Sequence, residues 1–407
     1  MKFLTRVCRL ILGAVFVFSG ILKLIDPVGT SLVMKEYFTA FHLGFLDFAA
    51  TGAAVALAFI EFLIGISMLA RLRVKFMSCL ALAVMSLFTL VTLYLALFNP
   101  IADCGCFGEA IHLSNWQTFF KNLILLPCAV VIFIWRRSIS EFEHPLAEWA
   151  FVLLFALFGV TLLYYVSARG AIMEFSSLQT GNDIAAAPLA GDAYQTTFIY
   201  EKEGVRKSFT LDNLPDSTWT FVDSLTEGPE DGEAASDADF YVENATGVDI
   251  TSDILSRGKL LLLSVYDPEK FYQKHTSEDI SALRSRASEA GFDFLTVSSM
   301  LYGDDGQDSF VCTDPLACDT FPGVADRKLL MTLNRSNGGL TYLDEGTIIK
   351  KWAARAAFSP SLELSGITDS ELALLETGNH QRSTIALLLI SLLLGYLLKL
   401  VIFKFLK

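Results

Sequence analysis

Two cysteines separated by a single glycine lie in the short polar stretch 103–109, which reads Asp-Cys-Gly-Cys-Phe-Gly-Glu. A disulfide between Cys104 and Cys106 would close a small ring, and strain in such a ring makes the disulfide easier to reduce. Gly105 permits the unusual backbone angles that the ring requires. The spacing therefore favours a pair that exchanges electrons. A static disulfide and a pair of metal or cofactor ligands remain open as alternatives.

The residues around the two cysteines influence how easily a thiolate forms. Asp103 and Glu109 flank them, and like charges would raise the pKa of both thiols. A helix that begins near residues 114–115 would act in the opposite direction through its N-terminus. His112 is close enough in sequence to be a third metal ligand, but no fourth ligand is evident. No metal site is therefore predicted.

Five further cysteines fall into two groups. Cys8, Cys79 and Cys128 lie inside or beside apolar runs and are expected to behave as small core residues. Cys312 and Cys318 lie in a later polar loop, where an oxidising compartment would favour a stabilising disulfide between them. Two alternatives stay open for this second pair: a distal redox pair that exchanges electrons with the first pair, or free thiols.

The composition indicates a membrane protein that carries a soluble part. Of 407 residues, 53% are hydrophobic and only 18% are charged, and the net charge of −13 argues against a nucleic-acid partner. Six apolar runs are each near the roughly 20 residues that a bilayer requires. We place them at 7–25, 51–70, 75–98, 118–135, 148–166 and 384–403.

Positive charges predict how these six spans are oriented. Clusters of Lys and Arg open the first span, separate the second from the third, follow the fourth and close the sixth, and all of them fall on one side if the chain zigzags. That side is predicted to be the cytoplasm, together with both termini. The Cys104/Cys106 loop, the loop 26–50 and segment 167–383 fall on the other side, which is the periplasm if the membrane is a bacterial inner membrane. The clusters are Lys2, Arg6 and Arg9; Arg71, Arg73 and Lys75; Arg136 and Arg137; Lys399, Lys404 and Lys407.

One acidic residue lies inside a predicted span. Glu61 is near the middle of the second span, and an ionisable group at that depth is a functional candidate. A buried carboxylate must be paired, hydrogen-bonded or protonated, so we expect Glu61 to face the interior of the helix bundle. Lys23, near the outer end of the first span, is a plausible partner, and Asp26 follows it by about one turn. Either a structural ion pair or a role in proton relay or quinone contact would explain Glu61.

Segment 167–383 alternates in the manner of a soluble α/β domain. A strand, a helix and a second strand are followed by a hairpin and a helix, after an acidic stretch that predicts a linker. The strands are expected at 196–200, 206–211, 240–242, 260–266, 292–297, 340–343 and 347–352, the linker at 225–239, and the helices at 268–290 and 367–376.

Residues 1–140 resemble the DoxX-like/MauE (methylamine-utilisation) membrane family. The resemblance is carried by three motifs in the first helix, by the loop that contains both cysteines, and by Asn122. The motifs are Arg9-Leu10-Ile11-Leu12-Gly13, Phe18-Ser19-Gly20, Lys23-Leu24-x-Asp26-Pro27 and Asp103-Cys104-Gly105-Cys106-Phe107-Gly108. The family implies a four-helix bundle that is associated with extracytoplasmic thiol chemistry.

Residues 240–376 are similar to the second half of thioredoxin-like domains. The similarity rests on the stretch 335–340, on Asp344-Glu345-Gly346 and on Lys351-Trp352. Redox proteins of that fold carry Cys-x-x-Cys after the first core strand, whereas residues 266–270 contain no cysteine. A cis-proline usually precedes the hairpin strand, and Gly338 stands there instead. The resemblance therefore implies the fold without its usual active site.

These observations predict a membrane α-helical bundle of six spans joined to an α/β thioredoxin-like domain. The expected parts are 1–140, the four-helix bundle; 141–170, a fifth span; 171–239, strands and an acidic linker; 240–380, the thioredoxin-like domain; and 381–407, the last span. The predicted function is thiol–disulfide electron exchange through Cys104 and Cys106 with a protein partner outside the cytoplasm, with a membrane quinone as a candidate cofactor. The alternative is a membrane-anchored scaffold without enzymatic activity.

Overall fold

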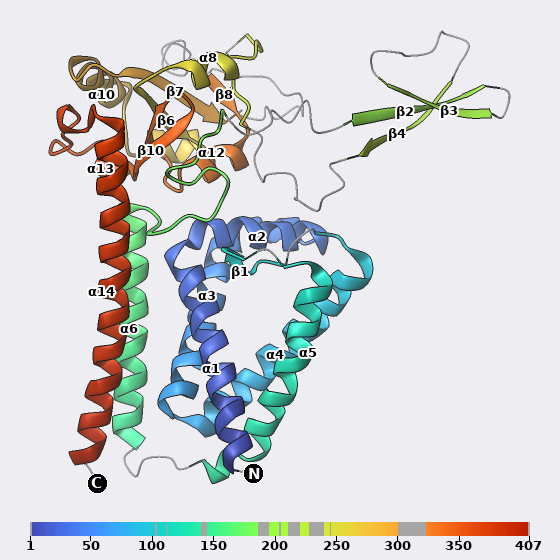
Figure 1. The fold of residues 1–407 in the computed structure, drawn as a ribbon, viewed down its shortest axis with the longest axis vertical. Coiled ribbons are helices and arrows are strands. Elements are labelled where there is room, and N and C mark those ends of the chain that lie inside the picture. Colours follow the sequence, from blue (N-terminus) through green and yellow to red (C-terminus); the bar gives the residue numbers. More distant parts are fainter. Residues whose placement is uncertain are drawn as a thin grey trace.

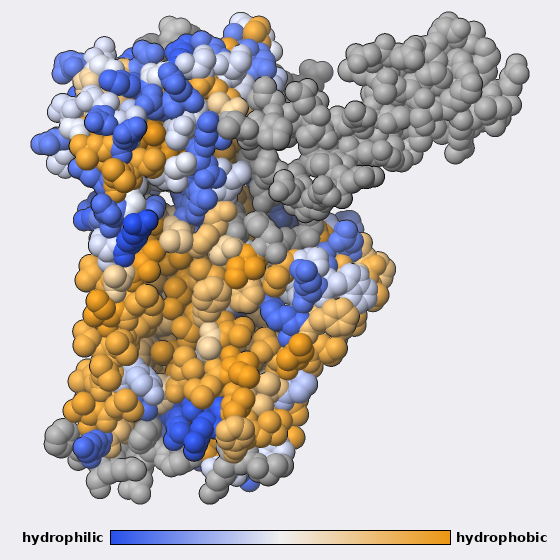
Figure 2. All heavy atoms as spheres, viewed as in Figure 1, coloured by the Kyte–Doolittle hydropathy of each residue, from blue (hydrophilic) through white to orange (hydrophobic). Residues whose placement is uncertain are grey.

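Six helices of the described chain are long and apolar enough to cross a membrane, as the hydropathy predicts. The structure, a computed structural model, describes residues 2–101, 104–111, 113–139, 145–185, 195–202, 205–210, 220–227, 240–244, 246–299 and 323–405. Apolar side chains cover the surface of the helical part in Figure 2, so the protein contacts the lipid bilayer. The six helices are α1 (Lys2–Ile25), α3 (Ala50–Ala70), α4 (Val74–Phe98), α5 (Asn115–Ile134), α6 (Pro145–Arg169) and α14 (Ser370–Phe405).

Helices α1, α3, α4 and α5 form a bundle, and α6 and α14 run beside each other along one side of it (Figure 1). Glycines bring α1 and α3 together: a Cβ atom at Gly20 would lie 2.5 Å from the backbone nitrogen of Phe62, and one at Gly65 would lie 2.4 Å from that of Val17. Small residues allow the backbones of membrane helices to approach closely. This contact places the buried polar groups of α1 directly against those of α3.

The segment 26–50, predicted as a loop, is helical. Helix α2 spans Pro27–Ala40, and a short 3-10 helix, η1, spans Gly44–Ala49. Asp26 is the N-cap of α2 and accepts a hydrogen bond from the backbone N–H of Gly29, while Pro27 occupies the first turn. In Figure 1, α2 lies across one end of the bundle, beside the short strand β1 (Cys106–Glu109).

A small antiparallel sheet follows α6 in the chain. Strands β2 (Gln195–Lys202) and β3 (Val205–Thr210) form the predicted hairpin, and β4 (Thr220–Glu227) pairs with the other side of β2. Residues 225–227, the start of the predicted linker, belong to β4. Residues 228–239 lie outside the described part of the chain.

A six-stranded sheet with helices on both faces forms the second large body, which we call the sheet region (residues 240–369). The strand order is β10-β9-β6-β7-β8-β5; β6, β7 and β8 are parallel, β9 is antiparallel to both β6 and β10, and β5 is antiparallel to β8. The strands are β5 (Glu243–Asn244), β6 (Leu260–Val265), β7 (Asp293–Ser299), β8 (Gly323–Ala325), β9 (Gly339–Asp344) and β10 (Thr347–Trp352). The helices are α8 (Thr251–Ser256), α9 (Pro268–Tyr272), α10 (Ser277–Glu289), α12 (Arg327–Leu333), α13 (Ala354–Ala357) and the 3-10 helix η4 (Ser365–Ile367).

Side chains of the central strand fill both cores of the sheet region. Leu260 and Leu262 of β6 pack on one face with α8 and α12, while Leu261 and Leu263 pack on the other with α9 and α10. Burial on both faces explains why β6 is a continuous apolar run.

Three predicted elements of the sheet region differ in the structure. The strand expected at 240–242 lies instead at 243–244, because only these residues pair with β8. The helix expected over 268–290 is two helices, α9 and α10, and Thr276 begins the second with a capping box. The helix expected at 367–376 begins at Ser370 and continues without a break into the sixth span as one helix, α14.

Candidate thiol site at the end of the helix bundle

The two cysteines face each other across a tight turn between α4 and α5. Gly105 adopts a left-handed backbone, with φ of +56°, which is an unusual conformation of the kind predicted there, and the backbone N–H of Gly108 donates to the Gly105 carbonyl over 2.9 Å. The Sγ atoms of Cys104 and Cys106 lie 2.9 Å apart. Cys104 is 4% exposed, whereas Cys106 is partly exposed. The turn thus presents one thiol and buries the other behind it.

Three helices hold this turn in place. Ser19 Oγ in α1 donates to the Cys106 carbonyl over 2.6 Å, and Tyr37 Oη in α2 donates to the Cys104 carbonyl over 2.7 Å. Thr118 Oγ1, in the first turn of α5, lies 3.2 Å from Cys104 Sγ. Each cysteine backbone is therefore anchored by a side chain from a different helix.

The electrostatic surroundings make the two thiols unequal. The pKa of Cys106 is lowered to about 7: the hydrogen bond from Cys104 has the largest effect, and Lys121 of α5 and Lys23 of α1 add to it against the opposing effects of burial and Glu61. The same hydrogen bond and burial raise the pKa of Cys104 well above its usual range. Cys106 is therefore the more acidic of the two thiols.

Glu61 lies inside the bundle with Lys23, as predicted. The carboxylate is 1% exposed, and its two oxygens each lie 2.7 Å from Lys23 Nζ. Ser19 Oγ lies 2.7 Å from Glu61 Oε2 and 3.0 Å from Lys23 Nζ, and it also bonds the Cys106 carbonyl. A continuous polar network therefore joins the buried ion pair to the thiol turn.

A small cavity separates Cys106 from Glu61. Its volume is about 20 Å³, which is room for about one water molecule. Asn122, which the sequence marked as a supporting residue, is buried in its wall and donates to Thr92 Oγ1 over 3.2 Å. Lys121 also lines the cavity, and its ammonium lies 4.2 Å from the centre of the Phe107 ring. The cavity is thus lined by the Cys106 thiol and the Glu61 carboxylate together with both polar and apolar side chains.

Asp26 lies at the same end of the bundle but has a different partner. Its carboxylate caps α2 and forms an ion pair with Arg335 of the sheet region, with Arg335 Nη2 2.9 Å from Asp26 Oδ2. Among the predicted residues, Cys104, Cys106, Glu61, Lys23 and Asn122 are brought together, and Asp26 lies one turn beyond Lys23.

Several predicted residues cannot be placed at this site. Asp103, His112, Cys312 and Cys318 lie outside the described residues, as does the side chain of Glu109. Within the described ranges, no group of three His, Cys, Asp or Glu side chains could hold a metal ion. The state of the Cys312/Cys318 pair stays a prediction.

The remaining cysteines do not all belong to the core. Cys8 of α1 is buried, as predicted, and lies within hydrogen-bonding reach of the partly exposed Cys128 of α5. Cys79 is exposed on α4, so the prediction of a core position for it was wrong. A helix that contacts lipid can place a cysteine on its outer face because the hydrocarbon surroundings are as apolar as a core.

Three functional side chains were missed in the sequence. Thr118 and Lys121 are three residues apart, and this helical spacing places both on the face of α5 that meets the thiol turn. That signal was available. Tyr37 belongs to a segment read as a loop, so nothing in its local sequence predicted contact with Cys104.

Comparison with known proteins covers two parts of the chain. Residues 1–135 match the family of methylamine utilisation protein MauE, which agrees with the resemblance of the first four membrane helices. Residues 194–227, which hold the small antiparallel sheet, match a domain of unknown function, DUF8463. No curated protein and no solved structure matches the chain.

Proposed function

We propose that this MauE-like membrane protein exchanges electrons with a protein partner through Cys104 and Cys106. The observation that carries the proposal is the pair itself: two sulfur atoms 2.9 Å apart, of which one has its pKa lowered to about 7 while the other stays protonated. An acidic, partly exposed thiol beside a buried resolving thiol is the arrangement that thiol–disulfide exchange requires.

The exchange begins when the Cys106 thiolate attacks a disulfide of the partner. A bond forms between Cys106 and one partner sulfur, and the other partner sulfur leaves as a thiolate. Cys104 then loses its proton and attacks the Cys106 sulfur, which forms the Cys104–Cys106 disulfide and releases the second partner sulfur. Two electrons pass to the partner, whose two sulfurs take up two protons, one from Cys104 and one equal to that released when Cys106 ionised. Each step is reversible.

Glu61 is proposed as the group that carries these protons. A water molecule in the cavity between Cys106 and Glu61 would pass a proton from one to the other, and Lys23 would stabilise the carboxylate between transfers. A quinone ring does not fit this cavity, which has room for about one water. No step of the proposed reaction therefore involves a quinone.

The orientation of the chain is part of the proposal. In Figure 1, the thiol turn and the sheet region lie at one end of the membrane helices and both chain ends lie at the other. The Lys and Arg clusters support a cytoplasmic location for the end that carries the termini. The thiol site and the sheet region would then face the periplasm of a bacterial inner membrane.

The sheet region is proposed to be a thioredoxin-like domain without the Cys-x-x-Cys that the redox proteins of that fold carry. Support comes from the parallel β6–β7 pair, the antiparallel β9–β10 hairpin and the helices between them. Residues 266–270, at the end of β6, contain no cysteine. Gly338 precedes β9, and a Cβ atom there would lie 2.5 Å from the Phe271 ring. We propose the boundaries 1–140, 141–170, 171–239, 240–380 and 381–407 for the successive parts of the chain.

The test is a redox titration of the full-length protein in membranes. Glutathione buffers of graded potential are followed by alkylation and mass spectrometry of the peptide that contains residues 104–106. We expect one two-electron transition between dithiol and disulfide, and we expect Cys104→Ala to accumulate a mixed disulfide with the partner through Cys106. Cys128→Ala is the control and should change neither result. Cysteines that stay unpaired across potentials of about −180 to −320 mV would refute the proposal.

The second candidate is a scaffold that binds its partner without redox chemistry. The absence of cysteine from residues 266–270 favours it for the sheet region. A scaffold would retain its partner equally well when Cys104 and Cys106 are both replaced by alanine. A redox protein would lose the covalent complex in that variant.

A further inference from the structure

Helix α2 (Pro27–Ala40) lies over the thiol turn, and we call this helix the roof. Thr30, Val33 and Tyr37 lie on one face of the helix, at the i, i+3, i+7 spacing that aligns side chains. A Cβ atom at Gly105 would lie 2.4 Å from Val33 Cγ1, and Tyr37 Oη bonds the Cys104 carbonyl. Cys104 is only 4% exposed beneath this face. Helix α2 therefore contacts the turn at Gly105 and at the Cys104 carbonyl.

The sheet region contacts the N-terminal end of α2 through a buried ion pair. Arg335 Nη2 and Nε lie 2.9 Å and 3.1 Å from Asp26 Oδ2, and the two side chains are 3% and 7% exposed. Gly29 makes room for this contact, since a Cβ atom there would lie 2.5 Å from the Asp26 carboxylate and 3.0 Å from Arg335 Nη2. The N-cap of α2 is therefore also the residue that the sheet region holds.

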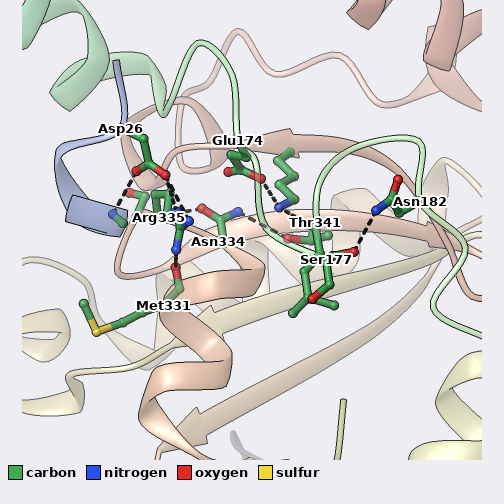
Figure 3. A network of polar contacts seen from close by, with 12 residues as sticks. Asp26, Glu174, Ser177, Asn182, Met331, Asn334, Arg335 and Thr341 are labelled. Atoms are coloured by element: carbon green, nitrogen blue, oxygen red, sulfur yellow. Dashed lines mark hydrogen bonds and ion pairs between the residues drawn. The ribbon is translucent and has the colours of Figure 1, made fainter. Parts of the chain in front are cut away.

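Neighbouring polar groups keep Arg335 in position, as Figure 3 shows. Arg335 Nη1 donates to the Met331 carbonyl at the end of α12 over 3.2 Å. The adjacent Asn334 donates to the Leu340 carbonyl and to Thr341 Oγ1 of β9. These bonds attach Arg335 to α12 and its neighbour Asn334 to β9, so the guanidinium is held in place beside Asp26.

A second contact holds the other end of the same helix. Lys328, in the first turn of α12, lies 2.9 Å from Glu36 Oε1, and both side chains are about half exposed. Glu36 directly precedes Tyr37, which bonds Cys104. The two ion pairs therefore attach both ends of α2 to one short stretch of the sheet region, residues 328–335.

We propose that Arg335 and Lys328 are positioning residues for the thiol site: through α2, the sheet region holds a roof over Cys104 and sets how often this thiol becomes accessible. That access to Cys104 matters for electron exchange rests on the proposed function, whereas the contact between α2 and the sheet region does not depend on it. This role would explain why a domain that has no cysteine at residues 266–270 is attached to the thiol end of the bundle.

The experiment measures the accessibility of Cys104 alone. The full-length Cys106→Ala protein in membranes is alkylated with a small neutral thiol reagent at a fixed pH, and the peptide carrying Cys104 is followed by mass spectrometry. Hydrogen exchange of residues 27–40 reports the opening of α2 in the same samples. The test variants are Arg335→Gln, Arg335→Lys, Lys328→Glu and Lys328→Glu with Glu36→Lys. The control is Lys274→Gln, an exposed cation of the same region.

We expect Arg335→Gln to speed alkylation of Cys104 by about tenfold or more, because it leaves Asp26 without the partner of a buried pair. Arg335→Lys should fall between Arg335→Gln and the parent, since lysine keeps the charge but lacks the two-nitrogen contact. Lys328→Glu should give no more than about a fivefold increase, as expected for an exposed pair, and the added Glu36→Lys should reverse it. Lys274→Gln should match the parent.

An unchanged alkylation rate in Arg335→Gln with unchanged exchange in α2 would overturn the inference. If Arg335→Gln instead loosens the whole sheet region, the exposed Lys328–Glu36 pair provides the test. If Glu36→Lys then fails to reverse the faster alkylation of Lys328→Glu, the roof is not held by charge. Because the readout is a single cysteine, it does not depend on redox activity. If the glutathione titration shows no transition but Arg335→Gln speeds alkylation of Cys104, the proposed function is refuted and the role of Arg335 and Lys328 is retained.

Discussion

The clearest consequence of the site geometry is that Cys104 makes Cys106 acidic, and removing the Cys104 sulfur tests this directly. Cys104→Ala deletes the donor that lies 2.9 Å from Cys106 Sγ. Cys104→Ser is the matched control, because a hydroxyl can still donate to the thiolate. Burial, which raises the pKa of Cys106, remains in both variants.

The magnitude follows from the two ionisation constants. The pKa of Cys106 is lowered to about 7 in the parent. Without the donor it should return to about 8.5 or higher, the ordinary value for cysteine. At pH 7 the thiolate fraction then falls from about one half to about 3%. A more basic thiolate is also a better nucleophile, by about fivefold for this shift, so the net loss in alkylation rate at pH 7 is only about threefold.

The decisive quantity is therefore the midpoint of the pH–rate profile. Alkylation of Cys106 in the full-length reduced protein is measured from pH 5 to pH 10 by peptide mass spectrometry. The parent and Cys104→Ser should rise through a midpoint near 7, and Cys104→Ala should rise about 1.5 pH units later and overtake the parent at high pH. Equal midpoints for the parent and Cys104→Ala would show that the hydrogen bond does not lower the pKa of Cys106.

Three further outcomes are expected. Glu61→Gln should destabilise the protein by about 3–5 kcal/mol, since it leaves Lys23 buried without a charge partner. The double variant Glu61→Gln with Lys23→Met should regain stability and still exchange slowly with glutathione. Exchange at the parent rate in the double variant would exclude Glu61 as the proton carrier. Gly65→Ala should lower the free energy of unfolding by about 1–3 kcal/mol in a detergent melt, because the new Cβ meets the backbone of α1, and Gly52→Ala, which has open space, should not. An impermeant thiol reagent should label reduced Cys106 from the periplasmic side of intact spheroplasts, and labelling only after permeabilisation would reverse the proposed topology.

Local sequence predicts those features of the site that depend only on the type of a residue and on its position within a membrane span. The spacing of Cys104 and Cys106, the glycine between them and a lone carboxylate inside an apolar run all have physical meanings that need no fold. Lys23 could be named as the partner of Glu61 because charge must be compensated at that depth. Six apolar runs likewise gave six helices, since length and hydropathy suffice for a bilayer.

Contacts between distant segments could not be predicted in this way. Arg335 and Asp26 are 309 residues apart, and neither has a local pattern that points to the other. The helix between Asp26 and the thiol turn was missed for a related reason. Asp26-Pro27 is a helix start signal, but the following residues lack a strong apolar periodicity. Tertiary packing, more than propensity, makes this segment helical.

The low pKa of Cys106 depends on groups that its neighbours in the sequence do not reveal. Acidic neighbours in the sequence argued for weakly acidic thiols, since Asp103 and Glu109 bear like charge. In the structure the pKa of Cys106 is lowered, first by the bond from Cys104 and then by Lys121 and Lys23. Lys121 follows Cys106 by fifteen positions in the sequence, and α5 folds back so that it reaches the cavity beside the thiol. The hydrogen bond and the charges that are near Cys106 in space, more than the charges near it in the chain, therefore set its pKa.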